Sequence, residues 1–372
     1  MAVGRGPLAR RVIAAIPGPR PDRGVWTGQR VFLTGHTGFK GGWLATWLQH
    51  LGAHVDGYAL PPEPGSLGDA LDVGGTFADL RDASALARAL HQAAPTVVFH
   101  LAAQPLVRRS YAAPLETFAV NVMGTATLLD LVRTTPSVRA VVVVTTDKVY
   151  ENREWPWPYR ETDALGGHDP YSASKAAAEL VTASFRRAFL AEAGVAVATA
   201  RAGNVVGGGD AAADRLVPDC LRAFAAGQPV RIRNPAATRP WQHVLDPVCG
   251  YLLLAEALLR GPDAACAWNF GPAPGDVRPV TDVVALLAEA WGDGAAWTLD
   301  AGAGPHEAGL LAVDAAQARA RLGWRPGLDL PAALRWTVDW SKRRQQGVSA
   351  RLLVLDDIER YAAATHSPDT AA

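Results

Sequence analysis

The chain has 372 residues, 49% of them hydrophobic and 19% charged, a composition typical of a soluble globular enzyme. Its 36 basic and 36 acidic residues cancel, which excludes a strong electrostatic attraction to nucleic acids or anionic membranes. The three cysteines, Cys220, Cys249 and Cys266, lack the spacing of metal ligands. We therefore predict free thiols in a reducing cytoplasm and no bound metal.

The first 24 residues are rich in arginine and proline, and their apolar run, Val12 to Ile16, is too short for a signal-peptide core. We predict that residues 1–24 form a disordered extension outside the fold. Farther along, no segment reaches the ~18 to 20 uncharged apolar residues that a membrane span requires.

From residue 30 onward, short apolar runs alternate with amphipathic stretches rich in alanine and leucine. RVFLTG, HVDGYAL, TVVFHLAA and AVVVVTT read as strands, and GGWLATWLQHLG, SALARALHQAA and TATLLDLVRTT read as helices. This alternation predicts an α/β fold, with a Rossmann-type doubly wound parallel sheet covered on both faces.

The domain organisation follows from where this alternation loosens. We place the Rossmann domain at residues 25–205 and expect residues 244–270 to return to it. Gly- and Pro-rich connections predict a smaller, mixed domain at residues 206–243 and 271–345, and residues 346–372 are interpreted as a tail.

The most specific early stretch is VFLTGHTGFKGG, in which Gly35, Gly38 and Gly41 follow the first strand and open a helix. Bare backbone at such a turn lets amides approach a pyrophosphate, and the helix N-terminus adds partial positive charge. We interpret the turn as a dinucleotide site; a merely tight turn is the alternative.

Charge near the second and third strands bears on which dinucleotide binds. Glu63 comes slightly late for the acid that contacts the ribose, but no basic residue lies between Lys40 and Arg81 to hold a 2′-phosphate, which favours NAD over NADP. Asp79 either contacts the adenine amino group or caps the helix ASALARAL, and both interpretations stay open.

The segment YSASK places Tyr171 and Lys175 four residues apart, so both side chains lie on one helix face. A tyrosine with a pKa near ~10 is a poor base at neutral pH. We expect the lysine ammonium and an oxidised nicotinamide to lower the pKa of Tyr171 by favouring its phenolate.

The strand in VVVVTTDKVY ends in Thr145, Thr146, Asp147 and Lys148. Ligands of open α/β sheets bind at the carboxyl ends of the strands. An acid beside a base is what an elimination needs, since one group protonates a leaving hydroxyl while the other removes a carbon-bound proton. An exposed surface turn is the alternative.

Several longer motifs resemble those of the extended short-chain dehydrogenase/reductases: TGHTGFKGGWL, GYAL, HLAAQPLVRRSY, GGHDPYSASK, RAGNVVGGGD and DRLVPD. TTDKVYENREW and ATRPWQHVLDP are similar to the CDP-sugar branch of that group, the CDP-glucose 4,6-dehydratase family. Related dTDP-glucose dehydratases generally carry an acidic residue where Lys148 stands. The resemblance extends over about residues 28–340.

This resemblance implies a mechanism for residues of this chain. Tyr171, assisted by Lys175, takes the proton of the sugar 4-hydroxyl while NAD accepts hydride from carbon 4, and Thr146 orients that hydroxyl. Neutral Lys148 then removes the carbon 5 proton, Asp147 protonates the departing 6-hydroxyl, and the hydride returns to carbon 6.

The resemblance further implies which residues contact the cofactor and the substrate, CDP-glucose. Asn204, Arg215 and Arg239 would bind the diphosphate, since arginine forks match phosphate oxygens. Trp241 would contact ribose or base, or else pack in the core. Besides the residues above, the implied sugar contacts are Gln104 and Arg108, and the implied cofactor contacts are Thr37, Phe39, Leu80, Leu101, Ala102 and Ala103.

Family members commonly form homodimers or larger assemblies, so the resemblance implies the same here. Three rival functions stay open: a nucleotide-sugar epimerase or reductase on the same fold, a dTDP-glucose dehydratase, and a non-enzymatic NAD(H)-binding protein. An epimerase or reductase would share Gly35, Tyr171 and Lys175 but would have no use for Asp147 with Lys148.

Overall fold

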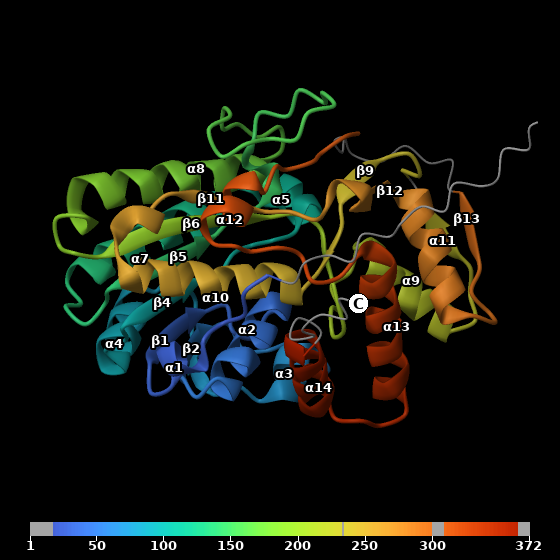
Figure 1. Cartoon of the computed structure of the whole chain (residues 1–372), viewed down its shortest axis with the longest axis horizontal. Helices are drawn as coiled ribbons and strands as arrows, with labels where there is room; N and C mark the ends of the chain where they lie inside the picture. Colours follow the sequence, from blue (N-terminus) through green and yellow to red (C-terminus); the bar gives the residue numbers. More distant parts are fainter. Residues whose placement is uncertain (1–17, 233, 300–308, 364–372) are drawn as a thin grey trace, which may run out of the picture.

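The computed structural model describes residues 18–232, 234–299 and 309–363. At its centre lies a seven-stranded parallel sheet of order β11-β6-β5-β4-β1-β2-β3 (Figure 1). This sheet confirms the predicted doubly wound fold. Its strands are β1 (Arg30–Thr34), β2 (His54–Ala59), β3 (Gly75–Phe77), β4 (Val97–His100), β5 (Ala140–Val144), β6 (Ala196–Ala202) and β11 (Ala267–Phe270).

The central strands carry apolar residues at nearly every position because both faces of the sheet are covered. Strand pairing aligns Thr34 with His100 and His100 with Val143. The loops that follow β1, β4 and β5 therefore open at the same edge of the sheet, which is where the predicted site residues come together.

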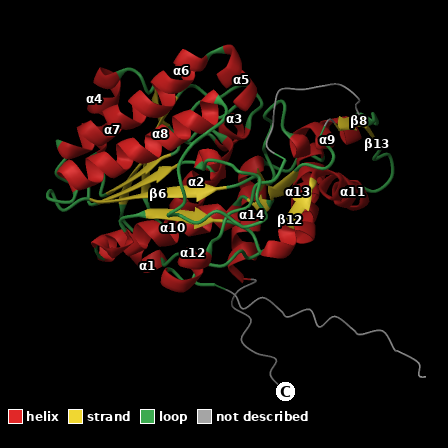
Figure 2. Ribbon diagram, turned by 90° about the horizontal axis from the view of Figure 1, so that it is seen from above, coloured by secondary structure: helices red, strands yellow, loops and turns green. Residues whose placement is uncertain are grey.

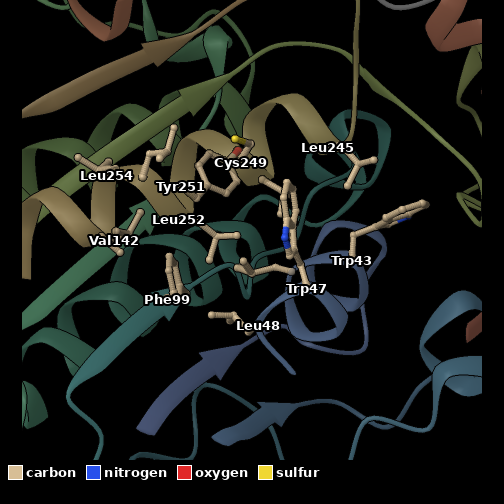
Figure 3. Close-up of a cluster of buried hydrophobic side chains, with 14 of the residues drawn as sticks. Trp43, Trp47, Leu48, Phe99, Val142, Leu245, Cys249, Tyr251, Leu252 and Leu254 are labelled. Atoms are coloured by element: carbon tan, nitrogen blue, oxygen red, sulfur yellow. The ribbon is translucent and has the colours of Figure 1, made fainter. Parts of the chain in front are cut away.

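Helices cover the two faces in two groups, one above and one below the sheet in Figure 2. One face carries α2 (Phe39–His50) and α10 (Leu245–Arg260), and the other carries α4 (Ala83–Ala93), α7 (Gly124–Arg133) and α8 (Pro170–Phe185). Figure 3 shows Trp47 of α2 and Leu252 of α10 packed near Phe99 and Val142 of the sheet.

Residues Pro114–Arg133 are long and apolar enough, by composition alone, to cross a membrane. They comprise α6 (Pro114–Phe118), a π-helical segment η1 (Ala119–Met123) and α7. Leu128, Leu129 and Val132 are buried in the core on the same face of the sheet as α4 and α8, and α6 packs against α8. Packing within the fold thus accounts for part of the apolar surface of this helix, whereas Leu115 and Met123 are exposed.

A smaller domain lies at the right of Figure 1. Its core joins α9 (Leu216–Ala225), α11 (Val280–Trp291) and α13 (Leu330–Gln345). Three two-stranded sheets complete it: β7 (Val205–Val206) with β10 (Gln242–His243), β9 (Thr238–Pro240) with β12 (Val277–Pro279), and β8 (Val230–Ile232) with β13 (Trp297–Leu299).

Both ends of the described chain differ from the sequence-based expectation. The Asp22 amide donates to Glu256 Oε1 at 2.8 Å, and the Arg20 guanidinium stacks 3.9 Å from the centre of the Tyr361 ring. The prediction of disorder is therefore wrong for residues 18–24, which include the start of α1 (Arg23–Trp26). Residues 1–17 lie outside the described residues.

The predicted tail contains a helix, α14 (Ala350–Ala363), that packs against α2 and α3 (Leu67–Leu71). Leu353, Val354 and Ile358 are fully buried, so this helix forms part of the core. Their helical spacing could have been recognised in the sequence, and the interpretation as a tail missed it. Residues 364–372 lie outside the described residues.

One segment assigned to the smaller domain belongs instead to the sheet. Ala318 of α12 (Ala316–Arg321) and the adjoining Trp324 are buried in the core cluster of the sheet beside β11. The remaining elements are α5 (Val107–Ala112) and the short turns η2 (Asp147–Val149), η3 (Arg186–Leu190), η4 (Pro262–Ala264) and η5 (Pro274–Asp276).

Candidate active site

The glycine turn after β1 has a geometry that other residues would disturb. Gly35 has a φ of +78°, and a Cβ there would meet the Ala102 amide nitrogen at 2.7 Å. A Cβ on Gly41 would overlap the Gly35 carbonyl oxygen. Gly38, the N-cap of α2, leaves the helix N-terminus open, so the turn fits the pyrophosphate of a dinucleotide.

The loop after β4 lies directly beside this turn. The Leu101 amide donates to the Thr34 carbonyl at 3.1 Å, and the Ala102 amide donates to the Thr34 hydroxyl at 3.2 Å. Thr37 donates its hydroxyl to the Leu60 carbonyl at 3.1 Å, so that hydroxyl is already engaged within the protein. The structure thus brings the implied cofactor residues of two loops together.

Asp79 does not cap the following helix. The Asp82 side chain accepts from the Ala85 amide and caps α4, so the capping interpretation of Asp79 is wrong. Arg81 instead binds the Asp79 carboxylate through Nε at 2.9 Å, which holds the pKa of Asp79 below its usual value. The adenine contact of Asp79 stays a prediction.

Helix α8 presents Tyr171 and Lys175 to the carboxyl end of β5. Lys175 is buried, and its Nζ donates to the Val144 carbonyl at 3.0 Å. Burial lowers the pKa of Lys175 to about 8, against the opposing effect of the Glu179 carboxylate one turn farther on.

The pKa of Tyr171 differs from the sequence-based expectation. It is raised to about 12, chiefly by burial and to a smaller extent by the negative charge of Asp147, whereas hydrogen bonding to Thr146 lowers it. The protein groups by themselves therefore disfavour the phenolate, because desolvation outweighs the favourable contacts.

The segment Thr146–Lys148 turns inward at the end of β5, so its interpretation as an exposed surface turn is wrong. Asp147 is fully buried, and its Oδ1 accepts from the Thr146 hydroxyl at 2.9 Å. Lys148 Nζ lies 3.4 Å from both Asp147 Oδ1 and Asn204 Oδ1. Among the described residues, no group hydrogen-bonds the buried Asp147 Oδ2.

Lys40 is a site residue that the sequence reasoning missed. Burial, followed by the positive charge of Arg215, lowers its pKa to about 8, and the charges of Asp147, Lys148 and Lys175 also act on it. Lys40 therefore lies among the predicted catalytic groups. The available signal was a lysine inside the glycine turn, in GFKGG.

Two of the three arginines implied for the diphosphate and the sugar are paired with acids in this structure. Arg215 NH1 lies 3.0 Å from Asp210 Oδ2, and Arg108 NH1 lies 2.8 Å from Asp214 Oδ1. Arg239 is buried and donates to the Thr238 carbonyl at 3.0 Å. A bound diphosphate would compete with these internal acceptors.

Two residues implied for the substrate are engaged elsewhere. Trp241 is buried in the core of the smaller domain and donates its Nε1 to the Arg278 carbonyl at 3.2 Å, which agrees with the core-packing alternative. The Gln104 side chain donates to Thr117 and Leu106 and accepts from the Leu106 amide. Its amide therefore orders its own loop.

Comparison with known proteins agrees with this geometry. The family model of the NAD dependent epimerase/dehydratase family matches residues 31–271. The chain belongs to that family. It is 46% identical over 357 residues to the CDP-glucose 4,6-dehydratase of Salmonella typhimurium, covering 92% of this chain and 99% of that protein. The resemblance seen in the motifs is confirmed.

Solved structures of the family share the fold. DesIV, a dTDP-glucose 4,6-dehydratase of Streptomyces venezuelae with NAD and TYD bound, matches with a TM-score of 0.74 and 25% identity, over 86% of this chain and 98% of its own. MoeE5 in complex with UDP-glucose and NAD matches with a TM-score of 0.72 and 28% identity, over 85% and 99%.

Proposed function

We propose that the protein converts CDP-glucose to CDP-4-keto-6-deoxyglucose, acting as an NAD-dependent hydro-lyase. One observation carries this proposal: the buried Asp147 carboxylate and Lys148 lie at the same strand end as Tyr171 and Lys175. The 46% identity to a CDP-glucose 4,6-dehydratase over nearly the whole chain supports the same substrate.

The cofactor is NAD, and when bound it would supply the hydride acceptor for carbon 4 of the sugar and the hydride donor for carbon 6. The glycine turn and the N-terminus of α2 would hold its pyrophosphate. Tyr171 takes the proton of the 4-hydroxyl. The Thr146 hydroxyl lowers the pKa of Tyr171 and so offsets part of the effect of burial. The positive charges of the Lys175 ammonium, fixed on the Val144 carbonyl, and of the oxidised nicotinamide would supply the further stabilisation of the phenolate that this step requires.

Asp147 and Lys148 carry out the elimination of water. The Asp147 carboxyl is oriented through Oδ1 by Thr146, and Oδ2 is left to donate its proton to the departing 6-hydroxyl. Lys148 in its neutral form, with Nζ 3.4 Å from that carboxyl, removes the proton from carbon 5 and becomes the ammonium. The two groups then act in one elimination across carbons 5 and 6.

A mass measurement tests the substrate and the reaction together. Incubation with CDP-glucose should yield a product lighter by one water, and dTDP-glucose should react more slowly. Faster turnover of dTDP-glucose would refute the CDP preference. A change in sugar configuration without loss of water would instead show an epimerase.

Asp147→Asn tests the assigned acid. We expect kcat for water loss to fall by roughly 10²- to 10⁴-fold, the usual range for a general acid, with CDP-glucose binding nearly unchanged. Binding is measured by titration calorimetry. An equal loss in binding and turnover would contradict the role of Asp147 as the acid.

We also propose an oligomeric state and a cellular location. We propose a homodimer formed through α6, η1 and α8, where Leu115, Met123 and Leu180 are more than half exposed on neighbouring helices (Figure 2). Sedimentation should show a dimer that Leu180→Asp dissociates, while Leu352→Asp on α14 should not. The three free cysteines support a reducing cytoplasm.

A further inference from the structure

A buried ion pair lies one helical turn beyond Lys175. Glu179 of α8 and Arg201 of β6 are 4% and 2% exposed. Arg201 donates from Nε to Glu179 Oε1 and from NH2 to Oε2, each at 2.9 Å. Replacing such a pair with apolar residues is often neutral or stabilising, so stability alone does not account for it.

Two further hydrogen bonds of this pair reach the two ends of the catalytic turn. The Thr145 hydroxyl, directly before the turn, donates to Glu179 Oε1 at 2.6 Å. The Tyr150 hydroxyl, directly after it, accepts from Arg201 NH1 at 2.8 Å and donates to Asn269 Oδ1 at 2.6 Å. One ion pair thus holds both residues that flank Thr146–Val149.

We propose that Glu179 and Arg201 are positioning residues that hold the turn bearing Asp147 and Lys148 in register with Tyr171. The inference rests on the proposed function, because it concerns the acid and base of that reaction. Glu179 lies on the same helix as Tyr171 and Lys175, so a single helix face sets the relative placement of the two catalytic pairs.

The backbone of the turn is also held at Val149, which is buried and whose carbonyl accepts from the Gly166 amide at 2.8 Å. The reacting side-chain atoms are held less closely: Lys148 Nζ lies 3.4 Å from Asp147 and Asn204, and Asp147 Oδ2 has no hydrogen-bond partner among the described residues. Catalytic groups lose rate steeply when displaced, since an error of about 1 Å costs on the order of 10²-fold. Holding both ends of the turn limits that displacement.

Thr199 provides a matched control for Thr145, because it binds the same Glu179 carboxylate. Its hydroxyl donates to Glu179 Oε2 at 2.6 Å, the same distance at which Thr145 binds Oε1. The two threonines are 2% and 4% exposed. Thr199 belongs to β6, however, and not to the catalytic turn, so its loss changes the ion pair without releasing the turn.

The test compares Thr145→Val with Thr199→Val in the full-length enzyme holding NAD. Both variants should lower Tm by similar amounts, because each deletes one hydrogen bond to Glu179. Only Thr145→Val should lower kcat for water loss, on the order of 10- to 100-fold, with KM for CDP-glucose and the Kd for NAD unchanged. Thr145→Ser, which keeps the hydroxyl, should restore kcat.

A single-turnover measurement locates the affected step. In Thr145→Val, NADH absorbance should rise as in the wild type and then decay more slowly, because oxidation at carbon 4, in which Tyr171 is the base, precedes the elimination that the turn carries out. Tyr150→Phe removes the hydroxyl that Arg201 binds but keeps the ring stacked on Tyr159, and it should show the same slow decay. This variant replaces Thr145→Val in the test if Thr145→Val does not fold.

Two outcomes would overturn the inference. Equal losses of kcat in Thr145→Val and Thr199→Val would show that the pair acts only through general stability or through the charge near Lys175. A wild-type enzyme that releases no water from CDP-glucose would overturn the proposed function, and this inference with it. If the wild type releases water normally but Thr145→Val and Thr199→Val lose kcat equally, the positioning role is overturned and the proposed function stands.

Discussion

The two ends of the substrate site are built in different ways. At the chemical end, Asp147 is buried and bonded to Thr146 just after β5, and Lys175 is buried and bonded to Val144 of β5. At the proposed binding end, Arg215, implied for the diphosphate, and Arg108, implied for the sugar, are more than a third exposed and pair with acids on a loop before α9.

This difference separates two demands on the protein. Bond breaking requires groups that stay within a fraction of an ångström of their position, and buried strand ends and helices provide that. Phosphate binding requires charge that can exchange an internal carboxylate for a ligand, and partly exposed arginines provide that. Changes at the first end should therefore alter kcat, and changes at the second should alter KM.

Tyr171→Phe should have the largest effect of the changes considered in this comparison. Removing the phenol deletes the base for the 4-hydroxyl proton, so we expect kcat to fall by roughly 10²- to 10⁴-fold. NADH should fail to appear in a single-turnover absorbance trace, while KM for CDP-glucose stays close to that of the wild type. A normal NADH burst would place the base elsewhere.

Arg215→Met should act mainly on binding. Hydrogen bonds to charged groups contribute about 1.5 to 3 kcal/mol, so we expect KM to rise by roughly 10- to 100-fold with kcat little changed. Steady-state kinetics with CDP-glucose give both constants. A dominant loss of kcat would break the comparison by assigning Arg215 to the chemical step.

A rise in pH should also weaken substrate binding, but less than Arg215→Met does. The pKa values of Lys40 and Lys175 are both lowered to about 8, so both are charged below that pH and neutral above it. Between about pH 7 and pH 9 the site loses positive charge, and KM for the anionic substrate should rise by roughly 3- to 10-fold. Lys40→Met should remove part of this dependence.

Arg108→Met should have the smallest effect. Arg108 and its partner Asp214 are 38% and 49% exposed, and such exposed ion pairs contribute less than about 1 kcal/mol to stability. We expect Tm to change little and KM to change by less than about threefold. A tenfold rise in KM would show that Arg108 binds the substrate directly, as the motif resemblance implies.

The sequence reasoning found the features that rest on local patterns. The glycine turn, the Tyr171–Lys175 spacing and the Thr146–Lys148 segment each lie within a short stretch next to a strand or helix. It overlooked Glu179, because a single glutamate on an amphipathic helix is indistinguishable from a solvated residue until its partner is known. That partner, Arg201, is 22 residues away on strand β6.

The same limit explains the corrections. For Trp241 the sequence offers a contact with ribose or base, with core packing as the alternative, and its burial beside α9 and α11 depends on residues distant in the sequence. Residues 18–24 look unstructured because arginine and proline dominate them, yet Arg20 finds Tyr361 at the opposite end of the chain.

By itself, the sequence determined the order of strands and helices, the cofactor turn, and the residue types that reach the carboxyl edge of the sheet. Those depend on periodicity and turn chemistry over a few residues. The tertiary structure alone decided which charges are buried, which acids hold the arginines and which pair holds the catalytic turn. Burial and ion pairing depend on neighbours that the chain brings together only when the sheet and its helices assemble.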